Sequence, residues 1–131
     1  MEKLLGIDYG KRRIGLAISI GSLAEVYGVV HFKTVNEALE KIKRIAEKEN
    51  VQGIVIGVSE GEMALESKNF AKELVKELET PVFFQDETLS THFAQKLSRE
   101  AGVGKKKRRK LEDAFAAAVI LQDYLNLRIA K

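Results

Sequence analysis

The chain has no cysteine, and this absence excludes several kinds of site. Without thiols there is no disulfide framework, no thiolate zinc site and no cysteine nucleophile, and the composition agrees with a reducing compartment. Only two histidines are present, His31 and His92, so a histidine-rich metal centre is excluded as well. A metal site in this chain would have to rely on carboxylate oxygens.

Long apolar runs are also missing. No run approaches the ~20 residues that a membrane-spanning helix needs, and the N-terminus MEKLLGIDYG lacks the parts of a signal peptide. With 131 residues, 45% hydrophobic and 31% charged, the chain has a globular composition and enough length to bury a core. We therefore expect one domain over residues 1–131, in the cytoplasm and away from membranes.

Tryptophan is absent, and few aromatic residues lie near the one strongly charged segment, residues 105–110 (KKKRRK). The chain has a net charge of +3, and this run alone carries six positive charges, so the rest is net negative. One interpretation is a solvated cationic linker between helices. The other is a phosphate-binding surface, because clustered lysine and arginine release the counterions of nucleic acid. Base stacking near the run is not evident.

Alternating apolar residues predict strands over residues 3–9, 13–20 and 26–33, separated by turn residues. Strands this close in sequence form an antiparallel meander. A continuous apolar run over residues 51–58 predicts a strand buried on both faces, and residues 81–85 predict a fifth strand.

Helical spacing of apolar residues predicts four helices. Residues 34–37 (TVNE) have the form of a capping box, and the helix that follows ends near Glu49. The second helix has Val75 on its apolar stripe, and the last is apolar nearly all round and therefore buried. The later helices are expected at about 64–79, 89–101 and 111–127.

The predicted order is β-β-β-α-β-α-β-α-α. Three antiparallel strands followed by αβ units with right-handed crossovers give an α/β domain with a mixed five-stranded sheet and helices on both faces. This is the element order of the ribonuclease H-like fold, although other α/β domains contain similar pieces. In such a sheet the first and fourth strands are central neighbours, and the last helix crosses near their ends.

Asp8 stands near the end of a predicted strand whose two faces both look covered. Burying an ionised carboxylate is costly unless a positive group meets it. The partner could be Lys11, Arg12 or Arg13 in the following turn, or backbone N–H groups, or a metal ion.

Two further segments carry acids that could meet Asp8. Asp86 and Glu87 are adjacent where the fifth strand ends, and alternation places them on opposite sides. Asp113 lies in the first turns of the predicted last helix. Helix capping and a favourable interaction with the helix dipole are the structural alternatives for these acids.

If Asp8, Glu87 and Asp113 converge, their carboxylates form a site for a hard cation such as Mg²⁺ or Mn²⁺. Two such ions about 3.5–4 Å apart can activate water and stabilise the leaving oxygen in phosphodiester hydrolysis. We therefore expect these three residues to be the catalytic metal ligands of an endonuclease. Whether Asp86 or Glu87 is the ligand stays open.

Three segments resemble the bacterial nucleases of pre-16S ribosomal RNA processing, a family also described as Holliday junction resolvase-like. Residues 6–19 (GIDYGKRRIGLAIS) are similar to its G-x-D-x-G-x-K-R-I-G-x-A-x-S pattern, and residues 86–91 (DETLST) to its D-E-R-L-S-T element. Residues 113–125 fit its D-x-x-A-A-x-x-I-L-Q-x-Y-L ending. The resemblance implies a ribonuclease H-like fold and metal-dependent endonuclease activity, with acids at the positions of Asp8, Glu87 and Asp113.

Three departures from the family pattern bear on the substrate. Thr88 replaces the usual arginine, and Ile20 stands where the family commonly has aspartate. The segment 57–66 is short and lacks the usual proline and asparagine. None of these changes removes a proposed metal ligand.

The resemblance implies processing of the 5′ end of precursor 16S ribosomal RNA, with resolution of branched DNA as the alternative. A four-way junction needs two symmetric cuts and hence a dimer, whereas one RNA cut needs a single site. We therefore favour structured RNA and a monomer or weak homodimer. Phosphate contacts are expected from two basic segments, Lys11, Arg12, Arg13, Lys105, Lys106, Lys107, Arg108, Arg109 and Lys110.

Two other classes of function remain. A non-catalytic module could use the basic run to hold nucleic acid without cleaving it. The hairpin that begins Gly6-Ile7-Asp8-Tyr9-Gly10 also resembles the first phosphate-binding element of actin, hexokinase and 70-kDa heat-shock ATPases. Those ATPases need two such domains to close around a nucleotide, and this chain has length for one.

Overall fold

A computed structural model describes residues 2–86 and 105–130, without the side chains of residues 105–110, 129 and 130. The predicted helix over 89–101 and its cap at Gly102 lie outside the described residues. The elements are β1 (Leu4–Tyr9), β2 (Arg13–Ile20), β3 (Leu23–His31), α1 (Val35–Glu49), β4 (Gly53–Val58), α2 (Gly61–Glu77), β5 (Val82–Asp86) and α4 (Lys105–Ala130).

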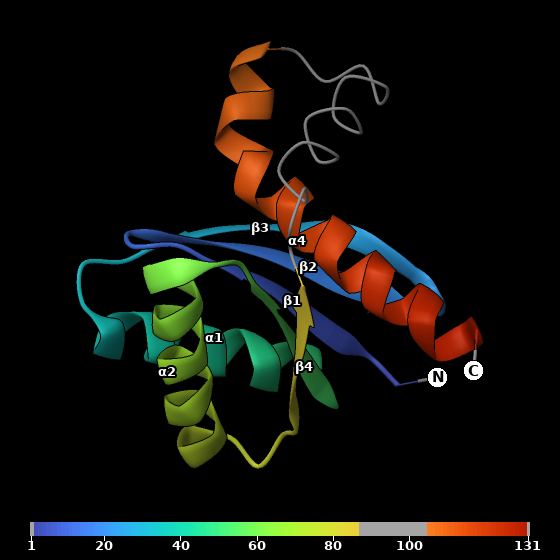
Figure 1. Cartoon of the computed structure of the whole chain (residues 1–131), viewed down its shortest axis with the longest axis horizontal. Helices are drawn as coiled ribbons and strands as arrows, with labels where there is room; N and C mark the ends of the chain where they lie inside the picture. The colour runs from blue at the N-terminus through green and yellow to red at the C-terminus, as the bar shows by residue number, and fades with distance from the viewer. Residues whose placement is uncertain (1, 87–104, 131) are drawn as a thin grey trace.

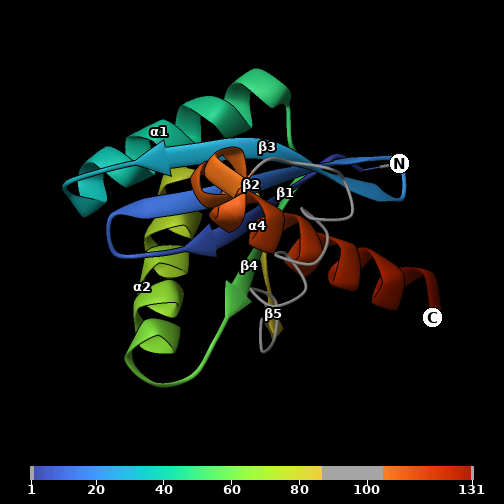
Figure 2. The same cartoon turned by 90° about the horizontal axis from the view of Figure 1, so that it is seen from above.

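The five strands form one mixed sheet in the order β3-β2-β1-β4-β5. β1 pairs antiparallel with β2 and parallel with β4, so the first and fourth strands are neighbours at the centre, as predicted. Helices α1 and α2 cover one face of the sheet, and α4 crosses the other (Figures 1 and 2). The predicted mixed five-stranded sheet with helices on both faces is confirmed.

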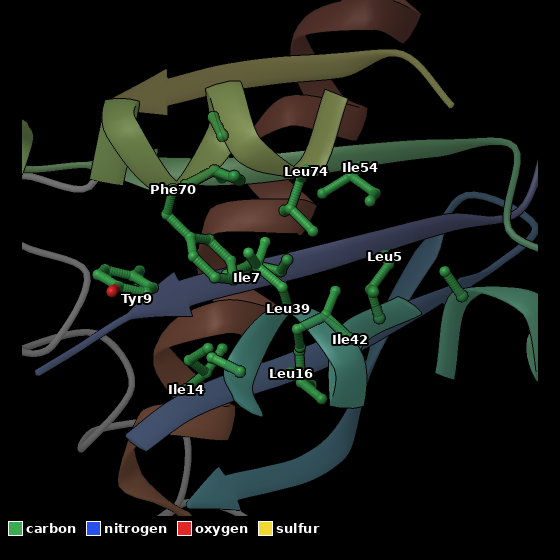
Figure 3. Packing of buried hydrophobic residues seen from close by; sticks show 14 of the residues in the cluster. Leu5, Ile7, Tyr9, Ile14, Leu16, Leu39, Ile42, Ile54, Phe70 and Leu74 are labelled. Carbon is green, nitrogen blue, oxygen red and sulfur yellow. The ribbon is translucent and has the colours of Figure 1, made fainter. Parts of the chain in front are cut away.

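The face of the sheet under α1 and α2 carries the larger apolar core (Figure 3). Leu5, Ile7 and Tyr9 of β1 point into it, as strand alternation predicts. Phe70 and Leu74 of α2 close over them and are almost fully buried. Each such side chain contributes about 1.5–3 kcal/mol by its burial, so this face supplies much of the stability.

The opposite face packs against α4 through smaller residues. Leu4 and Ala17 of the sheet meet Ala117 and Leu121 of the helix in a second buried cluster. At Gly6 an added Cβ would lie only 2.8 Å from the Cβ of Leu121. The missing side chain therefore lets α4 approach β1 closely.

Helix α1 begins with the predicted capping box. The Thr34 hydroxyl accepts a hydrogen bond of 3.2 Å from the Glu37 N–H, and the Glu37 carboxylate accepts one of 3.1 Å from the Lys33 N–H. These bonds satisfy N–H groups at and just before the helix start, which have no intrahelical partner.

The predicted start of the last helix at residue 111 is wrong, because α4 begins at Lys105. Lysine and arginine favour helices, but a run of charges has no apolar period that would reveal one. Residues 105–110 are therefore helical and do not form a linker. These first turns project away from the sheet, whereas the rest of α4 lies across it (Figure 1).

Other predicted limits shift by a few residues. The strand expected over 26–33 is β3, which begins at Leu23, and the helix expected over 64–79 is α2, which begins at Gly61. Val75 was expected on the buried stripe of that helix, but it is 54% exposed. The side chain of Val75 lies outside the buried core cluster.

Within the described ranges, no helix combines the length and apolar character that crossing a bilayer requires. That residues 1–131 form one domain stays a prediction.

Candidate active site

Asp8 lies in β1 on the face that packs against α4. Side chains two apart on a strand share a face, and Leu4 belongs to the α4 cluster while Gly6 touches Leu121. Asp8 follows them at the same spacing and is half-buried. Its carboxylate therefore belongs to the side of the sheet that α4 crosses.

Asp113 of α4 lies beside Asp8, and Gly15 reveals this placement. Gly15 is the direct cross-strand partner of Asp8 in the antiparallel pair of β1 and β2. A Cβ built on Gly15 would collide with the backbone carbonyl of Asp113. Because opposed residues of such a pair have Cβ atoms about 4.5–5.5 Å apart, the chain at Asp113 passes directly next to Asp8.

The Asp113 carboxylate is partly buried and paired. Its Oδ2 lies 2.6 Å from the Nε of Arg13, two residues before Gly15 on β2. Burial raises the pKa of Asp113, and the neighbouring Glu112 adds to that rise. Arg13 and, less strongly, His31 act in the opposite direction on this pKa without reversing the rise.

His31 is a site residue that the sequence analysis missed. It is the cross-strand partner of Arg13 at the end of β3, so it joins the group around Asp113. The sequence carries a signal for this, since position 31 falls in a predicted strand. Only the register of β2 and β3 shows which residue it opposes.

The helix-dipole alternative for Asp113 is wrong. The dipole acts within the first turn of a helix, and α4 begins at Lys105, two turns before Asp113. The helix dipole therefore does not explain why a partly buried acid stands at this position in the helix. Its neighbours in the fold are Asp8 and Arg13.

Asp86 lies on the other face of the sheet from Asp8. It is level with Val58 of β4, and Val58 shares its face with Ile54 and Ile56, which belong to the α1–α2 core. Phe83 is three positions before Asp86 on β5 and so points to the opposite face, where it stacks on Tyr124 of α4 with ring centroids 5.5 Å apart. Asp86 is therefore not on the side of Asp8 and Asp113, and Glu87 lies outside the described residues.

The predicted basic segments divide into three positions. Lys11 and Arg12 form the exposed turn after β1. Arg13 pairs with Asp113. Residues 105–110 form the projecting turns of α4, which lead directly into Asp113. Their contacts with nucleic acid stay a prediction.

The donors brought together suit a hard cation. Asp8 and Asp113 offer carboxylate oxygens, and Mg²⁺ is commonly held by one or two carboxylates with water and substrate phosphate completing the shell. Gly15 leaves the space in which the two segments meet. In the part of the chain that the structure describes, no group of three or more His, Cys, Asp or Glu side chains could hold a metal, so a third ligand would have to come from elsewhere.

Solved structures of junction resolvases share this fold. T. thermophilus RuvC in complex with a Holliday junction substrate superposes with a TM-score of 0.70 at 15% identity, over 100% of this chain and 98% of that one. The fowlpox virus Holliday junction resolvase gives a TM-score of 0.61 at 14% identity, over 96% and 99% of the two chains. These likenesses confirm the predicted ribonuclease H-like fold.

Sequence relatives cover nearly the whole chain. A protein of Halothermothrix orenii named "Putative pre-16S rRNA nuclease" is 42% identical over 95% of this chain and 94% of its own length. A protein of Carboxydothermus hydrogenoformans with the same name is 37% identical over 96% and 97%. The family described as "RuvX: Holliday junction resolvase" matches residues 2–127. The predicted family resemblance is confirmed, and this chain belongs to the RuvX family.

Proposed function

We propose that this chain is a metal-dependent endonuclease that hydrolyses phosphodiester bonds at the 5′ end of precursor 16S ribosomal RNA. One structural observation carries the proposal: the backbone of Asp113 fills the space over Gly15, directly beside Asp8. Two acids far apart in sequence thereby share one face of the sheet. The names of the relatives supply the substrate.

The metal ligands in this proposal are Asp8, Asp113 and Glu87. Glu87, which lies outside the described residues, is preferred to Asp86 because Asp86 lies on the α1–α2 face of the sheet. Oxygen donors of this kind suit Mg²⁺ or Mn²⁺. When bound as a pair, such ions supply an activated water and neutralise the leaving oxygen.

The chain itself fixes the two described acids on rigid elements. Asp8 is held by the central strand β1, and Asp113 by a helix whose backbone lies against Gly15. A catalytic group on a strand or helix is positioned more accurately than one on a loop. Arg13 holds the Asp113 carboxylate in one orientation through the 2.6 Å contact.

The basic segments bind the phosphate backbone of the substrate. Lys11 and Arg12 extend from the turn beside the end of β1, and residues 105–110 from the projecting turns of α4. Phosphate contacts set the position of a strand but do not read its sequence. Selectivity then comes from the shape of the folded RNA. The cytoplasm is the expected site of action.

Branched DNA is the second candidate substrate. The family description names Holliday junction resolvases, and the fold is that of RuvC. Resolution would require two copies of the chain related by a two-fold axis, so that two strands are cut symmetrically.

The proposal is tested by incubating the protein with precursor 16S RNA and with a four-way DNA junction, with and without Mn²⁺. We expect wild type to cut the RNA only with metal, and Asp8→Asn to lose more than about 100-fold in rate. Even mutation of residues that only hydrogen-bond to a metal ligand typically lowers metal affinity or activity about 10–100-fold. Asp123→Asn, an exposed acid farther along α4, is the matched control and should cut normally. Cleavage of neither substrate by wild type would favour the non-catalytic module, and normal cleavage by Asp8→Asn would refute the assigned site.

A further inference from the structure

A groove of about 770 Å³ opens on the α1–α2 side of the sheet, at the end of β1. Its floor is formed by three aromatic residues from separate segments, each of which is at least nine-tenths buried. Tyr9 stacks on Phe70 with ring centroids 4.4 Å apart, and on Phe32 with centroids 5.9 Å apart. Figure 3 shows Tyr9 beside Phe70 at one end of the core cluster.

The walls of the groove expose apolar side chains. Val35 begins α1 and is 46% exposed, and Val75 of α2 is 54% exposed. Val75 was predicted to be buried in the core, but its side chain lines this groove, which explains its exposure. A ligand with a flat apolar body would remove both valines from water.

The rim is charged and net positive. Lys11, Lys33, Lys72 and Lys76 surround the opening, against Glu66 and Glu73. Lys76 is paired with Glu73 at 3.4 Å, one turn away on α2.

The other three lysines are available to an incoming anion. Within residues 2–86 and the described part of α4, Lys11, Lys33 and Lys72 make no ion pair. The groove thus combines an apolar floor with unneutralised positive charge, which is the chemistry of a base and its phosphate.

We infer that this groove binds a single-stranded segment of the nucleic-acid substrate, with phosphates on Lys33 and Lys72 and a base against the exposed side chains of Val35 and Val75. The inference rests on the proposed nuclease function and adds a second contact region to it. A volume of this size falls within the range of small-ligand sites, about 300–1,000 Å³.

The position of the groove fits a substrate strand that continues past the active site. Tyr9 follows Asp8 directly and points to the opposite face of the sheet. Lys11 lies in the short turn between the two faces and lines the groove. A strand placed at Asp8 and Asp113 can therefore pass around this turn and enter the groove.

A nucleic acid fits the rim better than an acidic peptide does. Carboxylates such as Glu66 accept hydrogen bonds from the exocyclic amino groups of bases, as they do from cytosine N4 in DNA complexes. The aspartate and glutamate side chains of a peptide offer no such donors. Apolar contact with Val35 and Val75 also tolerates any sequence, because every base has a flat face that can be removed from water.

The test compares two double variants of the full chain that lose the same charge. Lys33→Gln with Lys72→Gln changes the groove, whereas Arg44→Gln with Lys48→Gln removes two exposed charges of α1 outside it. Fluorescence anisotropy measures binding of a short labelled oligocytidylate in EDTA, so that cleavage cannot interfere. We expect about tenfold weaker binding by the groove variant at 0.1 M salt and a salt slope smaller by about 1.4.

The control variant should bind within about twofold of wild type, since it lacks these phosphate contacts. Equal losses in both variants would show a general effect of surface charge and would overturn the inference, as would unchanged binding by the groove variant. An abasic chain of equal length should bind wild type about tenfold more weakly than oligocytidylate, because the apolar contact of the base is lost. Equal affinity for the two chains, or equally effective competition by polyglutamate, would overturn the base contact.

The two proposals fail in different ways. If the groove variant binds RNA weakly in EDTA while wild type cuts nothing with Mn²⁺, the groove stands and the nuclease proposal is wrong. If wild type cuts RNA and the groove variant binds like wild type, the nuclease proposal stands and the groove assignment is wrong.

Discussion

The two faces of the sheet are built from side chains of different size. Under α1 and α2 the contacts are large, and Ile42, Phe70 and Leu74 are almost fully buried there. Under α4 the sheet presents glycine and alanine at the closest points, as at Gly6 and Gly15. The first face gains stability from the burial of large apolar side chains. The second buries smaller side chains and gains less, but its glycines let the helix backbone approach the strands closely.

The faces also differ in charge. The α4 face holds Asp8 and Asp113, and burial raises the pKa of Asp113 even with Arg13 beside it. A partly buried acid with a raised pKa is typical of a functional site, because activity and stability place opposite demands on it. Under the proposed function, one face maintains the fold and the other performs the chemistry.

Phe70→Ala should give the largest loss of stability, because it opens a cavity in the α1–α2 core. We expect the free energy of unfolding to fall by about 3–5 kcal/mol, measured by urea denaturation. Leu65→Ala on the same helix is the control, since Leu65 is 61% exposed and should change stability by less than about 0.5 kcal/mol. Similar losses from both variants would show that this face is not the main source of stability.

Gly15→Ala breaks the other side of the comparison. A Cβ there meets the Asp113 carbonyl, so α4 must shift. The expected cost is about 1–3 kcal/mol, with cleavage lost because Asp113 moves away from Asp8. Gly28→Ala in β3 is the matched control, because nothing lies within 4 Å of its added Cβ. A Gly15→Ala protein that cuts normally would contradict the close approach of α4.

Thr34→Ala should weaken only the α1 side. Loss of the hydroxyl that accepts from the Glu37 N–H is expected to cost about 1 kcal/mol in denaturation experiments. Cleavage should be unchanged in rate, because α1 does not touch the α4 face. A parallel loss of activity would show that the two faces are coupled.

Asp113→Asn sharpens the comparison through pH. A carboxyl with a raised pKa binds its proton more tightly in the folded state, so wild type loses stability as the pH rises from the ordinary aspartate pKa of about 3.9 to the raised value. The amide variant lacks this loss. Thermal melts at several pH values should therefore show the variant gaining relative to wild type across that window and holding the gain above it. A relative loss would mean that the Arg13 ion pair outweighs burial.

Much of the fold could be predicted because strand alternation is a local property. The assignment of Leu5, Ile7 and Tyr9 to one face and Asp8 to the other needed only the period of two. The face on which Asp86 lies needed more, because it depends on how β5 is aligned with β4. The sequence alone does not show which residue of β5 lies opposite which residue of β4.

The errors have physical causes as well. The start of α4 was hidden because six charged residues favour a helix without showing an apolar face. Val75 fits the helical period of the buried stripe, but the core ends before it. The aromatic groove joins residues from β1, the β3–α1 connection and α2, and no local pattern predicts such a meeting.

The most direct test of the central claim is anomalous diffraction from crystals of the full chain grown with Mn²⁺. We predict a manganese peak bound by carboxylate oxygens of both Asp8 and Asp113, and its loss in crystals of Asp8→Asn. Manganese found elsewhere, with neither carboxylate in its coordination shell, would contradict the assignment of this face as the catalytic one.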